Sequence, residues 1–199
     1  MTKLEIIQKC LDRVKGDSTY LEIGVQNGDT FKQVKAAHKY GVDPVKLVDG
    51  VYEMTSDVFF TNYAPEFFQN RKVDVAFVDG LHTYEQSLKD VLNCLTHLAD
   101  NGVIVVHDCN PPSEEIANPN VAVVPEWCGD VWKMVVHLIR YNSEELNMCV
   151  LNCDYGVGLI TKVKKPRLGL DMSYKDLAAN RNVLLNLRYP HYLETFLDL

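Results

Sequence analysis

Two apolar runs, VDVAFVDG at residues 73–80 and GVIVVHD at residues 102–108, decide the fold of this chain. Each run contains four consecutive apolar residues, 75–78 and 103–106, which is typical of strands that are buried on both faces of a parallel sheet. The segment between them has apolar residues at the spacing of one helical face, namely Leu88, Val91, Leu92, Leu95 and Leu98. A strand, a helix and a second strand in this order form a parallel pair. This stretch therefore predicts an α/β fold with a doubly wound sheet.

The same alternation extends in both directions along the chain. Upstream, the pattern predicts a helix over 4–14, a strand over 20–25, a helix over 30–39, a strand over 40–43, a third strand within 46–53 and a helix capped by Thr55 or Ser56. Downstream, it predicts a proline-containing loop over 109–129, a helix over 130–141, an antiparallel strand pair at 149–151 and 157–160, and one or two helices over 173–199, the last opened by Pro190.

The composition restricts the class of protein. The chain has 199 residues and a formal net charge of −7, from Lys+Arg 20 against Asp+Glu 27. We expect a single domain over residues 1–199 and, because nucleic acids and acidic membranes need a basic partner, neither of these as partners. The chain has no apolar run of about 20 residues for a membrane span and no secretory-signal layout at its start. Its six cysteines form no C-x-x-C pair, so we expect a cytoplasmic protein with reduced thiols.

Polar residues gather where the predicted strands end. Ligands of open α/β sheets bind at the carboxyl ends of the strands, where the strand order reverses. The candidates at these ends are Glu22, Gly24, Gly28, Asp43, Asp79, His82, His107 and Asp108. Their coincidence at one edge of the sheet is harder to explain by solvation than any one of them alone.

The turn after the first strand, EIGVQNG at residues 22–28, has glycines that let a ligand approach the backbone. A dinucleotide fingerprint would read G-x-G-x-x-G, but Gln26 makes the spacing G-x-x-x-G, which suits a ligand without a pyrophosphate. Asp43 follows 19 residues after Gly24, where a carboxylate can accept hydrogen bonds from both ribose hydroxyls. The alternative is a strand–helix turn followed by one solvated aspartate.

Four segments in order resemble class I S-adenosylmethionine-dependent methyltransferases: YLEIGVQNGD at 20–29, GVDP at 41–44, FVDGLHTYE at 77–85 and NGVIVVHD at 101–108. They are most similar to the macrocin O-methyltransferase-like branch, methyltransferase family 24. The resemblance covers roughly residues 18–165. It implies a Rossmann-like sheet of seven strands, mostly parallel with one antiparallel edge strand, helices on both faces, and O-methylation of a small hydroxylated acceptor such as a sugar or natural product.

The resemblance also implies which residues bind the cofactor, S-adenosylmethionine. Around a core at 18–165 it leaves an N-terminal helix at 1–16, a substrate loop at 109–129 and C-terminal helices at 166–199. In this arrangement the methionine and ribose lie against Glu22, Gly24 and Gly28, and the ribose hydroxyls bind Asp43. The adenine is bordered by Met54 and Thr55, and Asp79 faces the methionine amino group or a metal.

His82 is the main candidate for a catalytic base, with His107 and Asp108 as further catalytic candidates. His82 stands just past a strand end, beside the expected position of the methyl acceptor. The unperturbed pKa of an imidazole, ~6.5, lets it take a hydroxyl proton at neutral pH. The alternative is a histidine that caps a helix or is satisfied in the core.

A divalent cation, Mg²⁺ or another, is a further expectation. Asp79 and Asp108 end neighbouring predicted strands, and hard cations prefer carboxylate oxygens. Some metal-dependent members of the resembled branch carry another carboxylate two residues after the first, where this chain has Leu81. Leu81 removes that carboxylate as a metal ligand or base, so His82 is the expected base.

Trp127 and Asp130 are the candidate substrate contacts, because they follow the predicted loop and flat apolar rings stack on sugars or aromatic acceptors. The alternative places Asp130 at a helix N-cap and Trp132 in the core.

Two other functions stay open: an NAD(P) or nucleotide-sugar oxidoreductase, against which Gln26 counts, and a non-catalytic S-adenosylmethionine-binding module. The expected partner is a small-molecule methyl acceptor, and a homodimer is compatible with the sequence.

Overall fold

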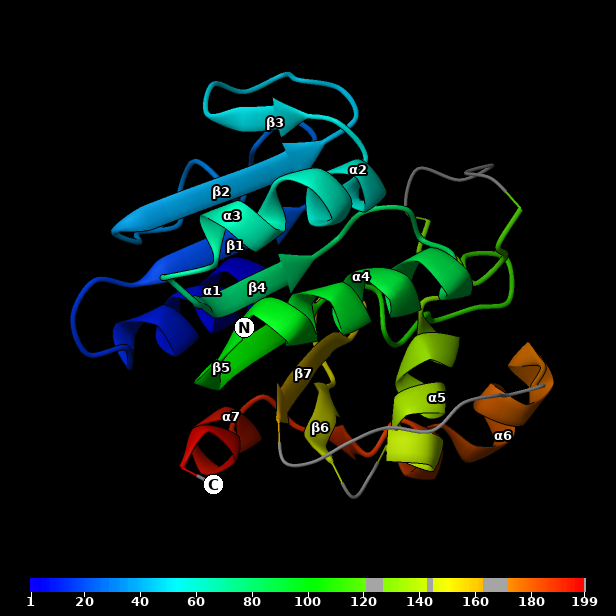
Figure 1. Cartoon of the computed structure of the whole chain (residues 1–199). Helices are drawn as coiled ribbons and strands as arrows, with labels where there is room; N and C mark the ends of the chain where they lie inside the picture. Colours follow the sequence, from blue (N-terminus) through cyan, green and yellow to red (C-terminus); the bar gives the residue numbers. More distant parts are fainter. Residues whose placement is uncertain (121–126, 143–144, 163–171, 199) are drawn as a thin grey trace.

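The computed structural model describes residues 1–120, 127–142, 145–162 and 172–198, and its central feature is a single sheet (Figure 1). Eight strands follow the order β3-β2-β1-β4-β5-β7-β6-β8. They are β1 Thr19–Ile23, β2 His38–Asp43, β3 Val51–Glu53, β4 Val73–Val78, β5 Leu98–Val106, β6 Leu146–Leu151, β7 Val157–Lys162 and β8 Leu187–Arg188. The predicted doubly wound, mostly parallel sheet is confirmed.

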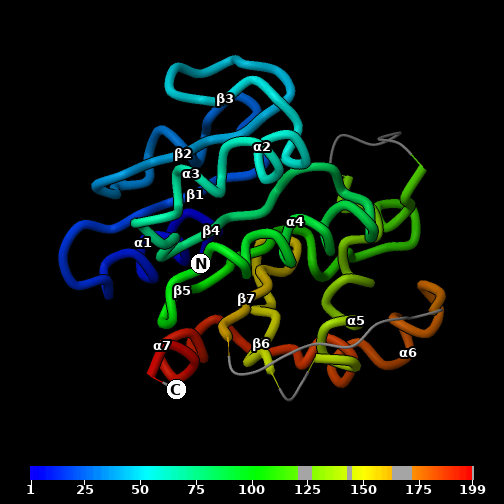
Figure 2. Tube along the Cα trace, viewed as in Figure 1, coloured from blue at the N-terminus to red at the C-terminus, as the bar shows by residue number. Residues whose placement is uncertain are grey.

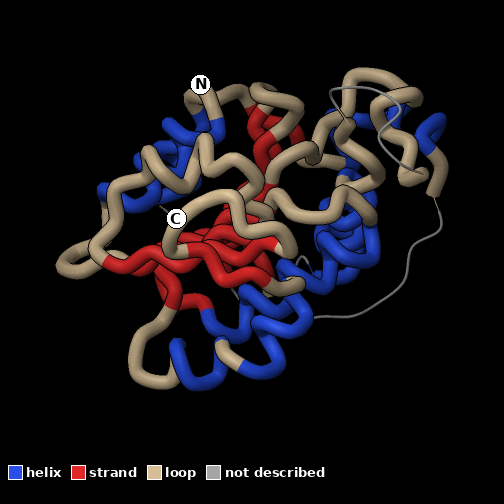
Figure 3. The backbone as a smooth tube through the Cα atoms, turned by 90° about the horizontal axis from the view of Figure 1, so that it is seen from above, coloured by secondary structure: helices blue, strands red, loops and turns tan. Residues whose placement is uncertain are grey.

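Helices cover both faces of the sheet (Figure 3). They are α1 Lys3–Asp12, α2 Ser56–Asn62, α3 Ala64–Phe67, α4 Tyr84–His97, α5 Trp132–Asn142, α6 Tyr174–Leu184 and α7 Tyr192–Leu197. Alternate strand residues point to opposite faces. In β4, for example, Ala76 and Val78 pack in the apolar cluster with α2–α6, whereas Val75 and Phe77 pack in the cluster with α1 and α7. This two-sided burial explains why the strand sequences are apolar throughout.

The antiparallel part of the sheet differs in detail from the expected seven strands with an antiparallel edge strand. β7 is antiparallel to both β5 and β6, so it lies inside the sheet. Beyond β6, the two-residue strand β8 pairs in parallel with Val150 and Leu151 and forms the edge. The sequence pattern did not predict β8 because two residues show no periodicity.

The predicted helix over 30–39 is wrong. Only a short turn forms there, through backbone bonds such as that from Lys32 to Gly28. The amides of Lys35 and Ala37 then donate to the side chains of Gln8 and Ser18, at 2.9 and 3.3 Å. These side-chain acceptors replace helical carbonyls, and the backbone extends into β2 from His38. The other predicted helices and strands are present, with bounds shifted by a few residues.

The chain trace in Figure 2 runs from α1 on one face of the sheet to α7 near the C-terminus. Parts of three predictions lie outside the described residues: 121–126 of the loop over 109–129, 163–165 of the core over 18–165, and 166–171 and 199 of the C-terminal helices. Among the helices within the described ranges, none is long and apolar enough to span a membrane.

The strand order reverses between β1 and β4, and the two strands end in close contact there. A Cβ atom at Gly24 would lie 2.1 Å from the carbonyl oxygen of Asp79, and Gly24 has a φ of +85°. Both observations require a glycine, because a side chain would collide with the backbone and favour another conformation. The residues that follow β1 and β4 are thereby brought to one edge of the sheet.

Candidate active site

A cavity of about 760 Å³ opens at this edge of the sheet. Predicted site residues that line it are Glu22, Gly24, Asp43, Thr55, Asp79, His82, His107, Asp108 and Trp127. Three others, Gly28, Met54 and Asp130, are not among its lining residues. The position of the cavity, outside the switch point between β1 and β4, is where doubly wound sheets bind ligands.

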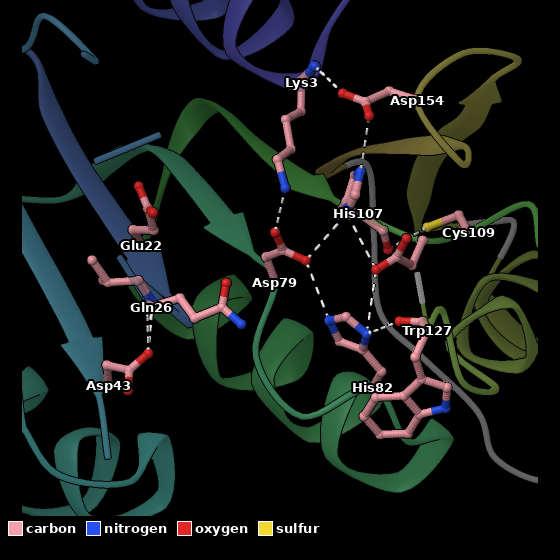
Figure 4. Close-up of polar contacts among 12 residues, drawn as sticks. Lys3, Glu22, Gln26, Asp43, Asp79, His82, His107, Cys109, Trp127 and Asp154 are labelled. Carbon is pink, nitrogen blue, oxygen red and sulfur yellow. Dashed lines mark hydrogen bonds and ion pairs between the residues drawn. The ribbon is translucent and has the colours of Figure 1, made fainter. Parts of the chain in front are cut away.

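Asp43 holds the glycine turn together on one side of the cavity (Figure 4). Its Oδ2 accepts hydrogen bonds from the amides of Val25 and Gln26, at 2.9 and 2.8 Å, and its Oδ1 accepts from Val45 at 2.8 Å. A carboxylate has about four lone-pair positions, so acceptor capacity for a ligand remains. Asp43 therefore shapes the turn as well as facing the cavity.

Gly28 and Met54 support the site from outside the cavity. Gly28 has a φ of +76°, and a Cβ there would lie 2.6 Å from a methyl group of Val48. Met54 packs against the apolar cluster that contains α2 and α4. Thr55 caps α2 by accepting a hydrogen bond from the amide of Val58 at 3.4 Å. Contact of these three residues with a cofactor stays a prediction.

Glu22 is buried in β1, only 1% exposed, beside the cavity. Burial raises the pKa of its carboxyl to about 8, although a hydrogen bond donated by the Tyr20 hydroxyl acts in the opposite direction. The raised pKa favours the protonated form of this carboxyl, which can donate a hydrogen bond, over the ionised form.

On the other side of the cavity, two carboxylates and an imidazole converge: donor atoms of Asp79, His82 and Asp108 all lie within 4.8 Å of one another. His82 Nε2 is 3.4 Å from Asp79 Oδ1, and its Nδ1 is 3.3 Å from Asp108 Oδ2. The same Nδ1 is 2.6 Å from the carbonyl oxygen of Trp127. Because a carbonyl only accepts, Nδ1 carries the hydrogen, and Nε2 is the nitrogen that can exchange a proton.

His107 joins the two carboxylates from above the cluster (Figure 4). Its Nδ1 lies 3.3 Å from Asp79 Oδ1 and 3.2 Å from Asp108 Oδ2, and its Nε2 lies 3.4 Å from Asp154 Oδ1. Burial lowers its pKa, but the three carboxylates outweigh burial and raise the pKa to about 11. His107 is thus held as a cation, whose role is to fix the carboxylates.

Two members of the cluster, Lys3 and Asp154, were missed by sequence reasoning. Lys3 begins α1, and its Nζ donates to Asp79 Oδ2 at 2.8 Å while its backbone amide donates to Asp154 Oδ2 at 2.7 Å. Burial alone would raise the pKa of Asp79, yet hydrogen bonds from His107 and His82 hold it well below the usual value. No local motif marks either residue, since Lys3 and Asp79 are 76 positions apart.

The donor atoms fit a divalent cation in kind, since two carboxylates and an imidazole are ordinary ligands. Three carboxylates, Asp79, Asp108 and Asp154, however, already face the cationic groups of Lys3 and His107 and the ring of His82. A bound cation would therefore compete with Lys3 and His107 for Asp79.

Trp127 forms a wall beside His82, with ring centroids 5.2 Å apart and planes at 30°. The backbone of Gly129 packs directly against the backbone of His82, since a Cβ at Gly129 would lie 1.7 Å from the His82 carbonyl oxygen. Asp130 acts elsewhere: its carboxylate accepts from the amide of Tyr84 at 2.6 Å and so caps the start of α4. Trp132 is 1% exposed and belongs to the core. For Trp132 the structural alternative is thus correct, and Asp130 caps a helix other than its own.

A polar floor that the sequence did not indicate lies between α2 and α4. Gln86 Nε2 donates towards Ser56 Oγ at 3.1 Å, Asp57 Oδ1 at 3.3 Å and Asp90 Oδ1 at 3.0 Å. Burial raises the pKa of Asp90 to about 6. The i,i+4 spacing of Gln86 and Asp90 on α4 was the available signal, because such residues share a helical face.

The sequence and the fold are both similar to those of methyltransferases. A family model described as a methyltransferase domain matches residues 25–109. The structure is similar to MycE methyltransferase from the mycinamycin biosynthetic pathway, solved with Mg, SAH and mycinamycin VI, at 14% identity and a TM-score of 0.50, covering 85% of this chain and 50% of that one. The chain thus spans about half the length of MycE.

Two further structures of methyltransferases with SAH have the same fold. PaMTH1 from Podospora anserina is 18% identical with a TM-score of 0.52, covering 80% of this chain and 77% of that one. SMU.1697c from Streptococcus mutans, described as a methyltransferase, is 13% identical with a TM-score of 0.51, covering 82% of this chain and 99% of that one. No curated protein matches the sequence. The chain is thus similar to a methyltransferase domain over residues 25–109 and shares its fold with methyltransferases that were solved with SAH.

Proposed function

We propose that this protein transfers the methyl group of S-adenosylmethionine to a hydroxyl group of a small-molecule acceptor. The observation that carries the proposal is the position of His82, whose exchangeable Nε2 lies beside Asp79 in the cavity outside the β1–β4 switch point. The structurally similar methyltransferases contain SAH, the demethylated form of this cofactor. An oxidoreductase is disfavoured by Gln26, which replaces the middle glycine of a dinucleotide turn.

The cofactor would lie along the two sides of the cavity. Glu22, Gly24 and the backbone around Gly28 would border its methionine and ribose, and the free lone pairs of Asp43 would accept from the ribose hydroxyls. Met54 and Thr55 would border the adenine. Asp79, held ionised, would face the methionine amino group, in place of the Lys3 ammonium that pairs with it now.

The transfer is an in-line displacement in which the acceptor oxygen attacks the methyl carbon and the bond from carbon to the sulfonium sulfur breaks. His82 Nε2 would take the hydroxyl proton, leaving the methyl ether and S-adenosylhomocysteine. For this role the ring must be neutral at Nε2, while its Nδ1 hydrogen stays on the Trp127 carbonyl. Trp127 would stack on the acceptor and exclude water, His107 and Asp108 would keep the cluster in place, and Asp130 would hold the loop against α4.

If the protein uses a divalent cation, Asp79 and Asp108 would hold it. When bound, such a cation would polarise the acceptor hydroxyl and lower its pKa. Proton removal by His82 does not require it.

Calorimetry of the purified protein with S-adenosylhomocysteine and, separately, with NAD tests the cofactor. We expect binding of the first and none of the second; the reverse result would overturn the proposal. Turnover of S-adenosylmethionine with a panel of hydroxylated acceptors then tests catalysis, and binding without turnover on any acceptor would favour a non-catalytic module.

A further inference from the structure

A second cavity, of about 440 Å³, is lined in part by the turn between β6 and β7. Its walls come from the segment after β5, from the turn between β6 and β7, and from α6. Tyr155 in that turn lines both cavities, and its neighbour Asp154 contacts His107. The second cavity is therefore adjacent to the proposed reaction site but separate from the proposed cofactor site.

The wall formed by Asn110 is held in place by the backbone. Gly156 has a φ of +88°, and a Cβ there would lie 2.4 Å from the amide nitrogen of Asn110. The Asn110 amide donates to the carbonyl of Tyr155 at 2.7 Å, and the Cys109 amide donates to the carbonyl of Gly156 at 2.9 Å. The two segments are thus packed as closely as a glycine allows, so a ligand would meet a preorganised surface.

The cavity is rich in hydrogen-bond donors. Arg181 of α6 donates to Asn110 Oδ1 and to the Tyr174 hydroxyl, the latter at 3.1 Å. Asn110 Nδ2 donates to Asn152 Oδ1 at 3.0 Å. A guanidinium has five N–H groups and a side-chain amide has two. Among the described residues, three guanidinium hydrogens and both amide hydrogens of Asn152 therefore keep no protein acceptor.

The charge of Arg181 is also without a protein counter-charge in the described part of the chain. No carboxylate there forms an ion pair with its guanidinium. Asp154, the acidic residue that lines the cavity, is engaged by His107 at 3.4 Å and by the backbone amide of Lys3 at 2.7 Å. The chain has a net charge of −7, so a partly buried arginine that has no carboxylate partner among the described residues is an unusual donor of positive charge.

We propose that this cavity binds an anionic group, a carboxylate or a phosphate, of the methyl acceptor, with Arg181 as its charge partner. The planar guanidinium can give two parallel N–H bonds to either group, and Asn152 can add a third. This inference rests on the proposed function, which it narrows to acceptors that carry both a hydroxyl and an anionic group. The two cavities share Tyr155, so an acceptor whose anionic group binds Arg181 would lie beside the proposed reaction site.

Inorganic phosphate and acetate are the probes, titrated calorimetrically at constant ionic strength with S-adenosylhomocysteine present at saturation. We expect the wild-type protein to bind at least one of them, and the stronger ligand indicates which anionic group the acceptor carries. Arg181→Gln should weaken this binding about tenfold or more, as expected for lost hydrogen bonds to a charged group. Asn152→Asp should weaken it similarly, because its carboxylate still accepts the bond from Asn110 but repels an anion.

Arg188→Gln is the matched control, since Arg188 is an exposed arginine on neighbouring β8 whose guanidinium lies over Tyr192. Its anion affinity should stay within about twofold of the wild type. The inference is overturned if the wild type binds neither probe, or if Arg188→Gln loses as much affinity as Arg181→Gln. Unchanged S-adenosylhomocysteine affinity shows that the variants are folded. If neither the wild type nor any variant binds S-adenosylhomocysteine, the result counts against the proposed function. Titrations of phosphate and acetate in the absence of S-adenosylhomocysteine would still test the anion site.

Discussion

On the β1–β2 side of the main cavity, Asp43 bonds to amides 17 and 18 positions away, whereas on the β4–β5 side Asp79 pairs with Lys3, 76 positions away. The first side is made of backbone donors around a carboxylate. The second is made of alternating carboxylates and cationic side chains, brought from α1, β4, β5 and the β6–β7 turn. The proposed cofactor side is therefore held by hydrogen bonds between nearby segments of the chain. The proposed reaction side is held by charge pairs between residues far apart in the sequence.

The largest effect should come from breaking the reaction side at His82. A positioned general base contributes ~10²–10⁴-fold, so His82→Ala should lower kcat by about that range while S-adenosylhomocysteine affinity changes by no more than a few fold. Turnover and melting temperature are measured on the same preparation. Leu81→Ala is the comparison variant: Leu81 also lines the cavity but has no group that takes a proton, so its replacement should act mainly through packing.

If His82 is instead a structural residue, its bond to the Trp127 carbonyl is what matters. His82→Ala would then melt at a lower temperature but turn over almost normally where it is folded. That result would transfer the role of base to another group.

Asp43→Ala should disrupt the proposed cofactor side of the cavity, after β1 and β2. The variant loses a charged acceptor of three backbone amides and, in the proposed site, of the ribose hydroxyls, so the binding free energy of S-adenosylhomocysteine should weaken by about 1.5–3 kcal/mol. Calorimetry measures the loss, and Asp49→Ala, at an exposed neighbouring position, is the control. Unchanged affinity would remove Asp43 from the cofactor site.

Asp90 is a buried carboxylate that can be compared with Asp79, because it lacks the cationic partners that Asp79 has. Its pKa of about 6 is above the usual value of 3.8, so ionisation opposes folding. The wild type should lose stability as pH rises from about 4 to 6, and Asp90→Asn should avoid that loss. We expect Asp90→Asn to be more stable by about 2 kcal/mol at pH 7 and no more stable at about pH 4. Chemical unfolding at both pH values measures this, and equal differences at the two would contradict the assignment.

The smallest effect concerns the cation. If Lys3 competes with a divalent cation for Asp79, Lys3→Met should bind Mn²⁺ about tenfold more tightly than the EDTA-treated wild type. Lys9→Met is the control, because Lys9 pairs with Glu194 at the surface of α1. If Mn²⁺ binds neither the wild type nor Lys3→Met, and EDTA leaves the activity unchanged, the cation hypothesis is wrong.

Much of the fold could be predicted, because strand burial shows directly in residue type. The runs ending at Asp79 and Asp108 are apolar since both faces of β4 and β5 are covered. Prediction was wrong over 30–39 because the side chains of Gln8 in α1 and Ser18 just before β1 accept hydrogen bonds from amides that a helix would use. Tertiary acceptors of this kind leave no periodic signal.

By itself the sequence determined the doubly wound sheet, the edge at which polar residues gather, and the candidates Asp43, Asp79, His82 and Asp108, because strand ends are local features that share one edge in a parallel sheet. Only the tertiary structure decided that Lys3 and Asp154 belong to the cluster, that Asp130 caps α4, and that Arg181 and Asn152 line the same second cavity. These contacts join residues 46 to 151 positions apart or bring α6 to the β6–β7 turn. Charge pairing over such separations depends on where the folded backbone places each side chain, and no local spacing carries that information.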